Sequence, residues 1–131
     1  MVYRVNHIHL RSYDPRADAE WWATAFGFEI VTDVQREQGD RFIICQMPDG
    51  LRLAVSDART GETLAAGDAG VREGLEHFGL DSEDVEGDVA RLTAMGAELL
   101  EGPEDGPVFR IVWLRCPGNV RLELMERRQQ A

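Results

Sequence analysis

Histidine is the residue type in this chain best suited to chemistry, and two of its three histidines open stretches that match each other at half of their positions. HIHLRSYD (residues 7–14) and HFGLDSED (residues 77–84) share His, Leu, Ser and Asp at the same four positions. An imidazole can ligate a metal ion in its neutral form, or transfer a proton near neutral pH. A histidine repeated at equivalent points of two modules makes a shared site possible, provided that the surrounding elements bring the two copies together.

The repetition continues along the chain. TAFGFE (residues 24–29) matches TAMGAE (residues 93–98), and RFIICQMPDGLRLAV (residues 41–55) lies over RIVWLRCPGNVRLEL (residues 110–124). These matches occur in the same order and at nearly one offset, which indicates an internal duplication. Two copies are too few for a solenoid, so the sequence favours two modules packed around a common centre.

The length of 131 residues suits one domain made of two such halves. We predict a first module at residues 1–56 and a second at residues 75–131. The intervening residues 57–74 are rich in Ala, Gly, Thr and Asp, and we interpret them as a linker.

Each module is predicted to run strand, helix and then three strands. Asp14 and Pro15 are a favourable start for a helix, and Asp84 is the equivalent start in the second copy. The expected elements of the first module are strands at 5–11, 28–34, 42–47 and 51–55, with a helix at 17–26. Those of the second are strands at 75–81, 97–100, 110–114 and 120–125, with a helix at 85–95 and a loop at 101–107.

Side chains alternate between the two faces of a strand, and this alternation places the polar residues. His7 and His9 share one face, while the neighbouring Ile8 and Leu10 form the apolar face that should cover the helix. In the last strand, Arg121 and Glu123 likewise fall away from the apolar side. The simpler interpretation is a solvated sheet face, since antiparallel sheets commonly expose polar residues on one side.

Composition limits the classes of partner. The net charge is −10 and all 14 basic residues are arginine, which argues against nucleic acid or an anionic membrane surface. No apolar run approaches the ~18 residues of a membrane span, and MVYRVNHIHL lacks the apolar core of a signal peptide. Two cysteines, Cys45 and Cys116, are too few for a disulfide framework, so we expect a reduced, cytoplasmic setting.

The opening VNHIHLRSYDPRADAEWWATAFGFEIV and the closing FRIVWLRCPGNVRLELME resemble the vicinal oxygen chelate superfamily. That superfamily includes glyoxalases, extradiol dioxygenases, fosfomycin-resistance enzymes and bleomycin-resistance binding proteins. The resemblance implies an α+β fold in which two tandem βαβββ modules form a curved, mostly antiparallel sheet around a central cavity. It also implies a homodimer.

Carried over residue by residue, the resemblance implies a metal site made of His7, His77 and Glu123. A fourth ligand of many members falls at Ala54, which cannot ligate, so the chain resembles the three-ligand members. Two imidazoles and one carboxylate suit one divalent ion (Fe, Mn, Co, Ni or Zn) and leave about three positions for water or substrate. The expected partner is a small-molecule substrate that offers two adjacent oxygens.

Three further residues are candidates near such a site. His9 is either a general acid or base or a polar residue that lines the cavity. Arg121 is either an anion clamp for substrate or a polar strand residue, and Trp113 is a candidate for the wall of a pocket that excludes water.

Three classes of function stay open from the sequence. The first is a metal-dependent enzyme, either a dioxygenase or a glyoxalase-like lyase or isomerase. The second is a metal-free protein that binds and sequesters a small molecule, in the manner of bleomycin-resistance proteins. The third is a regulatory or structural module that keeps only the fold. The filled histidine and acid positions favour the first class.

Overall fold

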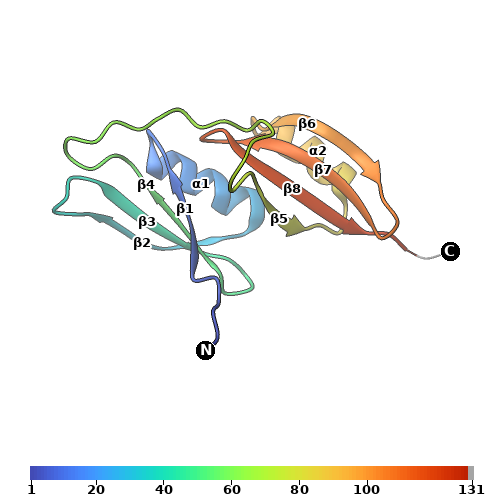
Figure 1. Ribbon diagram of the computed structural model, residues 1–131, viewed down its shortest axis with the longest axis horizontal. Helices are drawn as coiled ribbons and strands as arrows, with labels where there is room; N and C mark the ends of the chain where they lie inside the picture. Colours follow the sequence, from blue (N-terminus) through green and yellow to red (C-terminus); the bar gives the residue numbers. More distant parts are fainter. Residues whose placement is uncertain (130–131) are drawn as a thin grey trace. The chain divides into compact units, whose positions relative to one another are not determined.

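The structure, a computed structural model described for residues 1–129, consists of two copies of one βαβββ module (Figure 1). The first copy contains β1 (His7–Arg11), α1 (Pro15–Phe26), β2 (Glu29–Gln35), β3 (Arg41–Gln46) and β4 (Arg52–Ser56). The second contains β5 (Phe78–Asp81), α2 (Val85–Ala94), β6 (Glu98–Asp105), β7 (Phe109–Cys116) and β8 (Val120–Arg127).

Each copy folds into its own four-stranded mixed sheet with the same topology. The strand order is β1-β4-β3-β2 in the first sheet and β5-β8-β7-β6 in the second. Only the pairs β1–β4 and β5–β8 are parallel, and all other neighbours are antiparallel. The predicted pair of mostly antiparallel βαβββ modules is therefore confirmed.

The chain divides into two compact units, Met1–Ala65 and a second that begins at Ala66. The predicted linker is shared between them. Its first part bonds to the first unit, where Arg11 Nη1 donates to the carbonyl of Asp57 at 3.0 Å. Its second part bonds to the second unit, where Arg121 Nη1 donates to the carbonyl of Ala69 at 2.9 Å. The module boundaries at residues 56 and 75 stay a prediction.

The Ser and Asp of the repeated motif start the helix in each unit. The Asp14 carboxylate accepts from the backbone N–H of Ala17, and the Ser12 hydroxyl bonds both Asp18 and the backbone N–H of Asp14. These contacts satisfy backbone donors that the first helical turn leaves unpaired. Pro15 occupies the first turn, where its missing N–H costs nothing.

The second unit repeats this arrangement around α2. Asp84 accepts from the backbone N–H of Gly87, and Ser82 bonds both Asp88 and the backbone N–H of Asp84. The Ser and Asp positions of the duplicated stretch are thus accounted for by helix capping. The histidine that opens each copy has no such capping role and is the repeated residue that remains as a candidate for chemistry.

In each unit, one face of the sheet packs against the helix and forms the core. Trp22 of α1 and Leu92 of α2 are fully buried. The buried strand residues that alternate toward the helices are Ile43, Cys45, Leu53 and Val55 in the first unit and Val112, Leu114, Leu122 and Leu124 in the second. Because side chains alternate, the histidines fall on the opposite, open face of each sheet.

Two predicted elements differ most from the structure. The expected loop at residues 101–107 is wrong, since β6 continues to Asp105, and β6 contains Gly102 and Pro103. This strand lies at the edge of its sheet and its pairing shifts register twice, so a proline that cannot donate to a ladder is tolerated there. The strand expected at 75–81 begins only at Phe78, which leaves His77 just before it.

No helix among residues 1–129 combines the length and the apolar character needed to cross a lipid bilayer.

Candidate functional site

His7 stands at the start of β1 in the first unit. Its Nδ1 lies 2.8 Å from Oδ1 of the preceding residue, Asn6. An amide oxygen only accepts, so in the neutral ring this contact favours the tautomer with the proton on Nδ1. An unprotonated Nε2 is the form in which a histidine can ligate a metal ion.

His77 has the same arrangement in the second unit. Its Nδ1 lies 2.9 Å from Oε1 of the preceding residue, Glu76, which stands at the repeat position of Asn6. The hydrogen bond from His77 is the main cause that lowers the pKa of the Glu76 carboxyl, with further contributions from the Arg72 backbone N–H and the charge of Arg121. In the neutral ring this contact again favours the tautomer with the proton on Nδ1, and Nε2 is the nitrogen nearer to Glu123.

Glu123 of β8 is the partner of that nitrogen. Its Oε2 lies 3.7 Å from His77 Nε2, and its side chain is only 14% exposed. Across the parallel ladder Glu123 faces Gly79, and on the antiparallel side it faces Trp113. The Trp113 and His77 rings meet edge to face with centroids 6.4 Å apart. The carboxylate therefore lies between a position with no side chain and an aromatic wall.

The His77–Glu123 pair has the chemistry and spacing of two ligands to one ion. Two donor atoms at bond lengths of about 2.1 Å from a common ion are at most about 4.2 Å apart, and 3.7 Å falls inside that limit. The Glu76 contact adds an outer carboxylate of the kind that orients ligand histidines. Within residues 1–129, no group of three or more His, Cys, Asp or Glu side chains is arranged to hold a metal ion.

His9 follows His7 on the open face of the first sheet. Its Nε2 lies 2.7 Å from the hydroxyl of Ser56, and its ring meets Phe42 edge to face at 5.4 Å. Partial burial is the main cause that lowers the His9 pKa, and the charges of Arg11 and His7 add to it.

The residue opposite His9 in β4 is Ala54, the repeat equivalent of Glu123. At equivalent places, each sheet therefore pairs one ionisable residue with one small residue, but on opposite strands of the pair. His9 faces alanine in the first, and glycine faces Glu123 in the second.

Arg121 lies on β8, two residues before Glu123, and is 5% exposed. Its guanidinium bonds the carbonyl of Ala69 and the carboxylate of Glu101, and its Nε lies 3.6 Å from Oε1 of Glu76. It also sits over the Trp113 ring, 5.6 Å from the centroid. The sequence-based alternative of a solvated polar residue is therefore wrong for Arg121.

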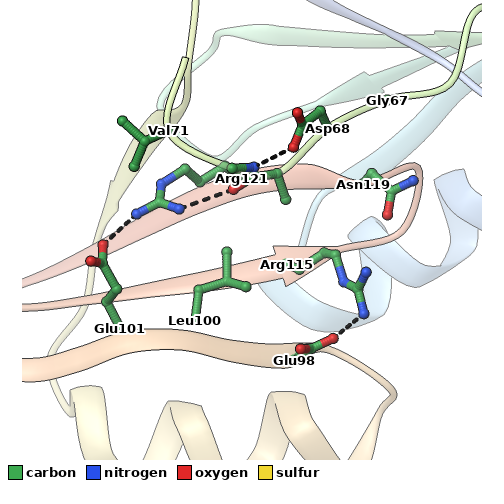
Figure 2. Close-up of a pocket in the computed structure, with 11 residues that line it drawn as sticks. Gly67, Asp68, Val71, Glu98, Leu100, Glu101, Arg115, Asn119 and Arg121 are labelled. Carbon is green, nitrogen blue, oxygen red and sulfur yellow. Dashed lines mark hydrogen bonds and ion pairs between the residues drawn. The ribbon is translucent and has the colours of Figure 1, made fainter.

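A pocket of about 540 Å³ opens beside Arg121, wholly within the second unit (Figure 2). The segment 67–71 forms one side, and Leu100, Glu101, Arg115 and Asn119 contribute from β6, β7 and the β7–β8 turn. Figure 2 shows Arg121 reaching from β8 to Glu101, and Arg115 paired with Glu98. The charges that line this pocket are largely paired with one another.

The predicted site residues thus fall into two groups. His77, Glu123, Trp113 and Arg121 come together on the open face of the second sheet. His7 and His9 lie together on the open face of the first, with ring centroids 6.3 Å apart.

Sequence reasoning missed Asn6 and Glu76, which hold the two repeated histidines. The available signal was their shared place directly before each repeated histidine. It also missed Ser56, the partner of His9, which lies 47 residues away in the chain.

The cysteines have no place in either group. Cys45 and Cys116 are both buried and free of disulfides. Burial raises the pKa of the Cys116 thiol to about 12, and burial also raises that of Cys45. Both thiols are core residues of low reactivity.

Solved structures with this fold carry different functions. A glyoxalase family protein from Bacillus cereus aligns with a TM-score of 0.85 and 20% identity over 98% of this chain and 97% of that chain. A variant of the fosfomycin resistance protein FosX from Listeria monocytogenes, complexed with Mn(II) and a dihydroxypropylphosphonic acid, aligns with a TM-score of 0.72 and 20% identity, covering 95% and 93%. The antibiotic binding protein TnmS3 from a Streptomyces species aligns with a TM-score of 0.67 and 19% identity, covering 97% and 98%.

At these identities the likeness shows the fold alone. A search of curated protein sequences finds no significant match. The family model of the Glyoxalase/Bleomycin resistance protein/Dioxygenase superfamily matches residues 4–124, nearly the whole chain. With two βαβββ modules and a histidine at the head of each, the chain belongs to this superfamily.

Proposed function

We propose that this protein is a divalent-metal-dependent enzyme that binds a small substrate through two adjacent oxygens. The proposed ligands are His7, His77 and Glu123. The observation that carries the proposal is the His77–Glu123 pair, whose nitrogen and oxygen lie 3.7 Å apart with the opposite ring nitrogen fixed by a carboxylate. The matching contact between His7 and Asn6 supports the same role for the first histidine.

A bound divalent ion would supply Lewis-acid chemistry, polarising a substrate oxygen or lowering the pKa of a bound hydroxyl. The chain itself would supply the surroundings. Trp113 limits water beside Glu123, and Gly79 leaves room for the carboxylate. His9, on the same face as His7 and bonded to Ser56, is the proposed general acid or base.

The proposed ligand set suits Fe, Mn, Co, Ni or Zn. The Mn(II) in the FosX structure, which shares this fold, makes Mn the first ion to test. Dioxygenase-like chemistry and lyase or isomerase chemistry are both compatible with three ligands. The identity of the metal found in the protein would distinguish between these two classes of reaction.

The proposal also includes a homodimer in the cytoplasm. Each sheet ends in unpaired edge strands, β1 and β2 in the first unit and β5 and β6 in the second. Such edges are commonly covered or paired. Size-exclusion chromatography with light scattering tests the dimer directly.

Metal content is the decisive experiment for the enzyme. Untagged protein from metal-supplemented medium should contain about one equivalent of a divalent ion by elemental mass spectrometry. His7→Ala, His77→Ala and Glu123→Ala should each lose it, while Asp81→Ala, an exposed carboxylate on β5, should keep it. Metal-free parent protein after reconstitution near neutral pH would overturn the proposal.

The second candidate is a metal-free protein that sequesters a small molecule. The observation that favours it is the pocket beside Arg121, whose lining includes none of the three proposed ligands. TnmS3, an antibiotic binding protein, shows that the fold can serve binding. A bound small molecule that co-purifies with metal-free protein and is lost in Glu101→Ala would support this candidate instead.

A further inference from the structure

We propose that Glu76 and Arg121 act as positioning residues for His77, with Arg121 holding Glu76 and Glu76 holding the imidazole so that Nε2 faces Glu123. The consequence for metal binding depends on the proposed function. The orientation of the imidazole ring does not depend on that function, because contacts within the second unit set it.

The first step is the position of the Glu76 carboxylate. Its Oε1 lies 2.9 Å from His77 Nδ1 and 3.6 Å from Arg121 Nε, so one oxygen faces both groups. Its Oε2 accepts from the backbone N–H of Arg72 at 3.4 Å. The carboxylate is thus approached from three sides by donors, and its side chain is 25% exposed.

The second step is the rigidity of Arg121. Its two terminal nitrogens are occupied by the carbonyl of Ala69 and the carboxylate of Glu101, and its face rests on Trp113. Its Nε is buried and has no hydrogen-bond partner within the described residues. The group nearest to this orphan donor is Glu76, at ion-pair distance. Because both terminal nitrogens of Arg121 are hydrogen-bonded, the guanidinium is fixed with its Nε beside Glu76.

The third step concerns the difference between the two histidines. His7 is held by a neutral amide and His77 by a carboxylate. Outer carboxylate partners of ligand histidines typically contribute about 10–100-fold to metal affinity. Within the duplicated pair, His77 should therefore be the stronger ligand.

The same contacts join the His77 site to the pocket of the second unit. Ala69 and Glu101, the two groups that hold the Arg121 terminal nitrogens, both line that pocket (Figure 2). The chain of contacts runs from Glu101 through Arg121 and Glu76 to His77. Residues that line the pocket are thereby connected to the proposed ligand His77 through other side chains, without contacting it directly.

The direct test is the tautomer of His77 in metal-free protein, read by long-range ¹H–¹⁵N NMR at a pH where the ring is neutral. The parent should show Nδ1–H. Glu76→Ala should lose this preference at His77 and leave His7 unchanged, and Asn6→Ala should do the reverse. Glu76→Gln, which keeps an acceptor oxygen, should largely preserve Nδ1–H.

Arg121 is tested by Arg121→Met, with Arg115→Met as the control at the other arginine of the pocket, which is paired with Glu98. Arg121→Met should mobilise the Glu76 side chain and broaden or shift the His77 signals, whereas Arg115→Met should not. If Arg121→Met fails to fold, Glu101→Gln, which loosens the same guanidinium, takes its place.

Metal affinity, measured with Mn²⁺ or Zn²⁺ against a competing chelator, gives the second readout. Glu76→Ala should weaken binding about 10–100-fold. An Nε2–H tautomer in the parent, or an unchanged tautomer in Glu76→Ala, overturns the inference. If the parent binds no metal, the proposed function fails while the tautomers still decide this inference.

Discussion

Gly79 lies directly opposite Glu123 in the parallel ladder of β5 and β8, and a Cβ at Gly79 would lie 3.4 Å from Glu123 Oε1. That distance is at the short end of ordinary van der Waals contact, so one methyl group fits beside the carboxylate, whereas a branched side chain would compete with it for space. The glycine gives the proposed ligand its space.

The first prediction follows from this contact. Gly79→Leu should push the Glu123 carboxylate away from His77 and weaken Mn²⁺ or Zn²⁺ binding by about 100-fold or more, at least the loss expected for an outer partner. Gly79→Ala should bind nearly as the parent does. Chelator competition measures both, and circular dichroism checks the fold. Parent-like affinity in a folded Gly79→Leu protein would show that metal binding does not depend on the space that Gly79 leaves beside Glu123.

The second prediction concerns the caps of the repeated motif. Asp84→Ala removes the acceptor for the Gly87 N–H at the start of α2 and should cost about 0.5–2 kcal/mol of unfolding free energy. Asp14→Ala should cost a similar amount at α1, because it removes the acceptor for Ala17. Urea denaturation measures both. Glu83→Ala, beside the cap, is the matched control and should change little.

The third prediction concerns acid stability. Asp40 is fully buried, and the hydrogen-bonded guanidinium of Arg36 is the main cause that lowers its pKa. A carboxyl with a lowered folded-state pKa stabilises the fold above its unfolded pKa of about 3.9, and this contribution is lost as the pH falls through the folded-state value. The Asp40 contribution should therefore be complete at pH 6–7 and decline below about pH 4.

Asp40→Asn measures this contribution. The variant should be less stable than the parent at pH 7, and the difference should shrink as urea denaturation is repeated toward pH 3. Glu37→Gln, an exposed neighbour, should follow the parent at every pH. A gap between Asp40→Asn and the parent that stays constant from pH 7 to pH 3 would contradict the assignment.

The fourth prediction concerns the thiols. With a pKa raised to about 12 and a buried side chain, Cys116 should not react with Ellman's reagent in native protein at pH 8. Cys45, also buried with a raised pKa, should behave alike. Two thiols should react after denaturation. Fast labelling of either cysteine in the native protein would show that its part of the core opens readily.

The sequence predicted those parts of the fold that depend on local signals. Asp14 with Pro15 marks the start of α1, and the structure begins the helix there. Strand alternation correctly separated the His7 face from the Ile8 face. The Gly and Pro content of residues 101–107 misled the prediction at β6, where an edge position and irregular pairing let Gly102 and Pro103 remain in a strand.

The site was harder to predict, because its supporting contacts join distant parts of the chain. The partners of Arg121 stand 52 and 20 residues away at Ala69 and Glu101, and no local pattern indicates that they meet. Its burial therefore could not be predicted from strand alternation, which assigns a face but not what covers that face. The role of His7, His77 and Glu123 as ligands stays a prediction.

The division of residues 57–74 between the two units has a consequence for engineering. A backbone break between Ala65 and Ala66 interrupts none of the hydrogen bonds described above, since each part of this segment bonds within its own half. A short insertion at this junction should therefore leave the described hydrogen bonds of both units intact, which makes it a suitable place for an affinity or fluorescent tag.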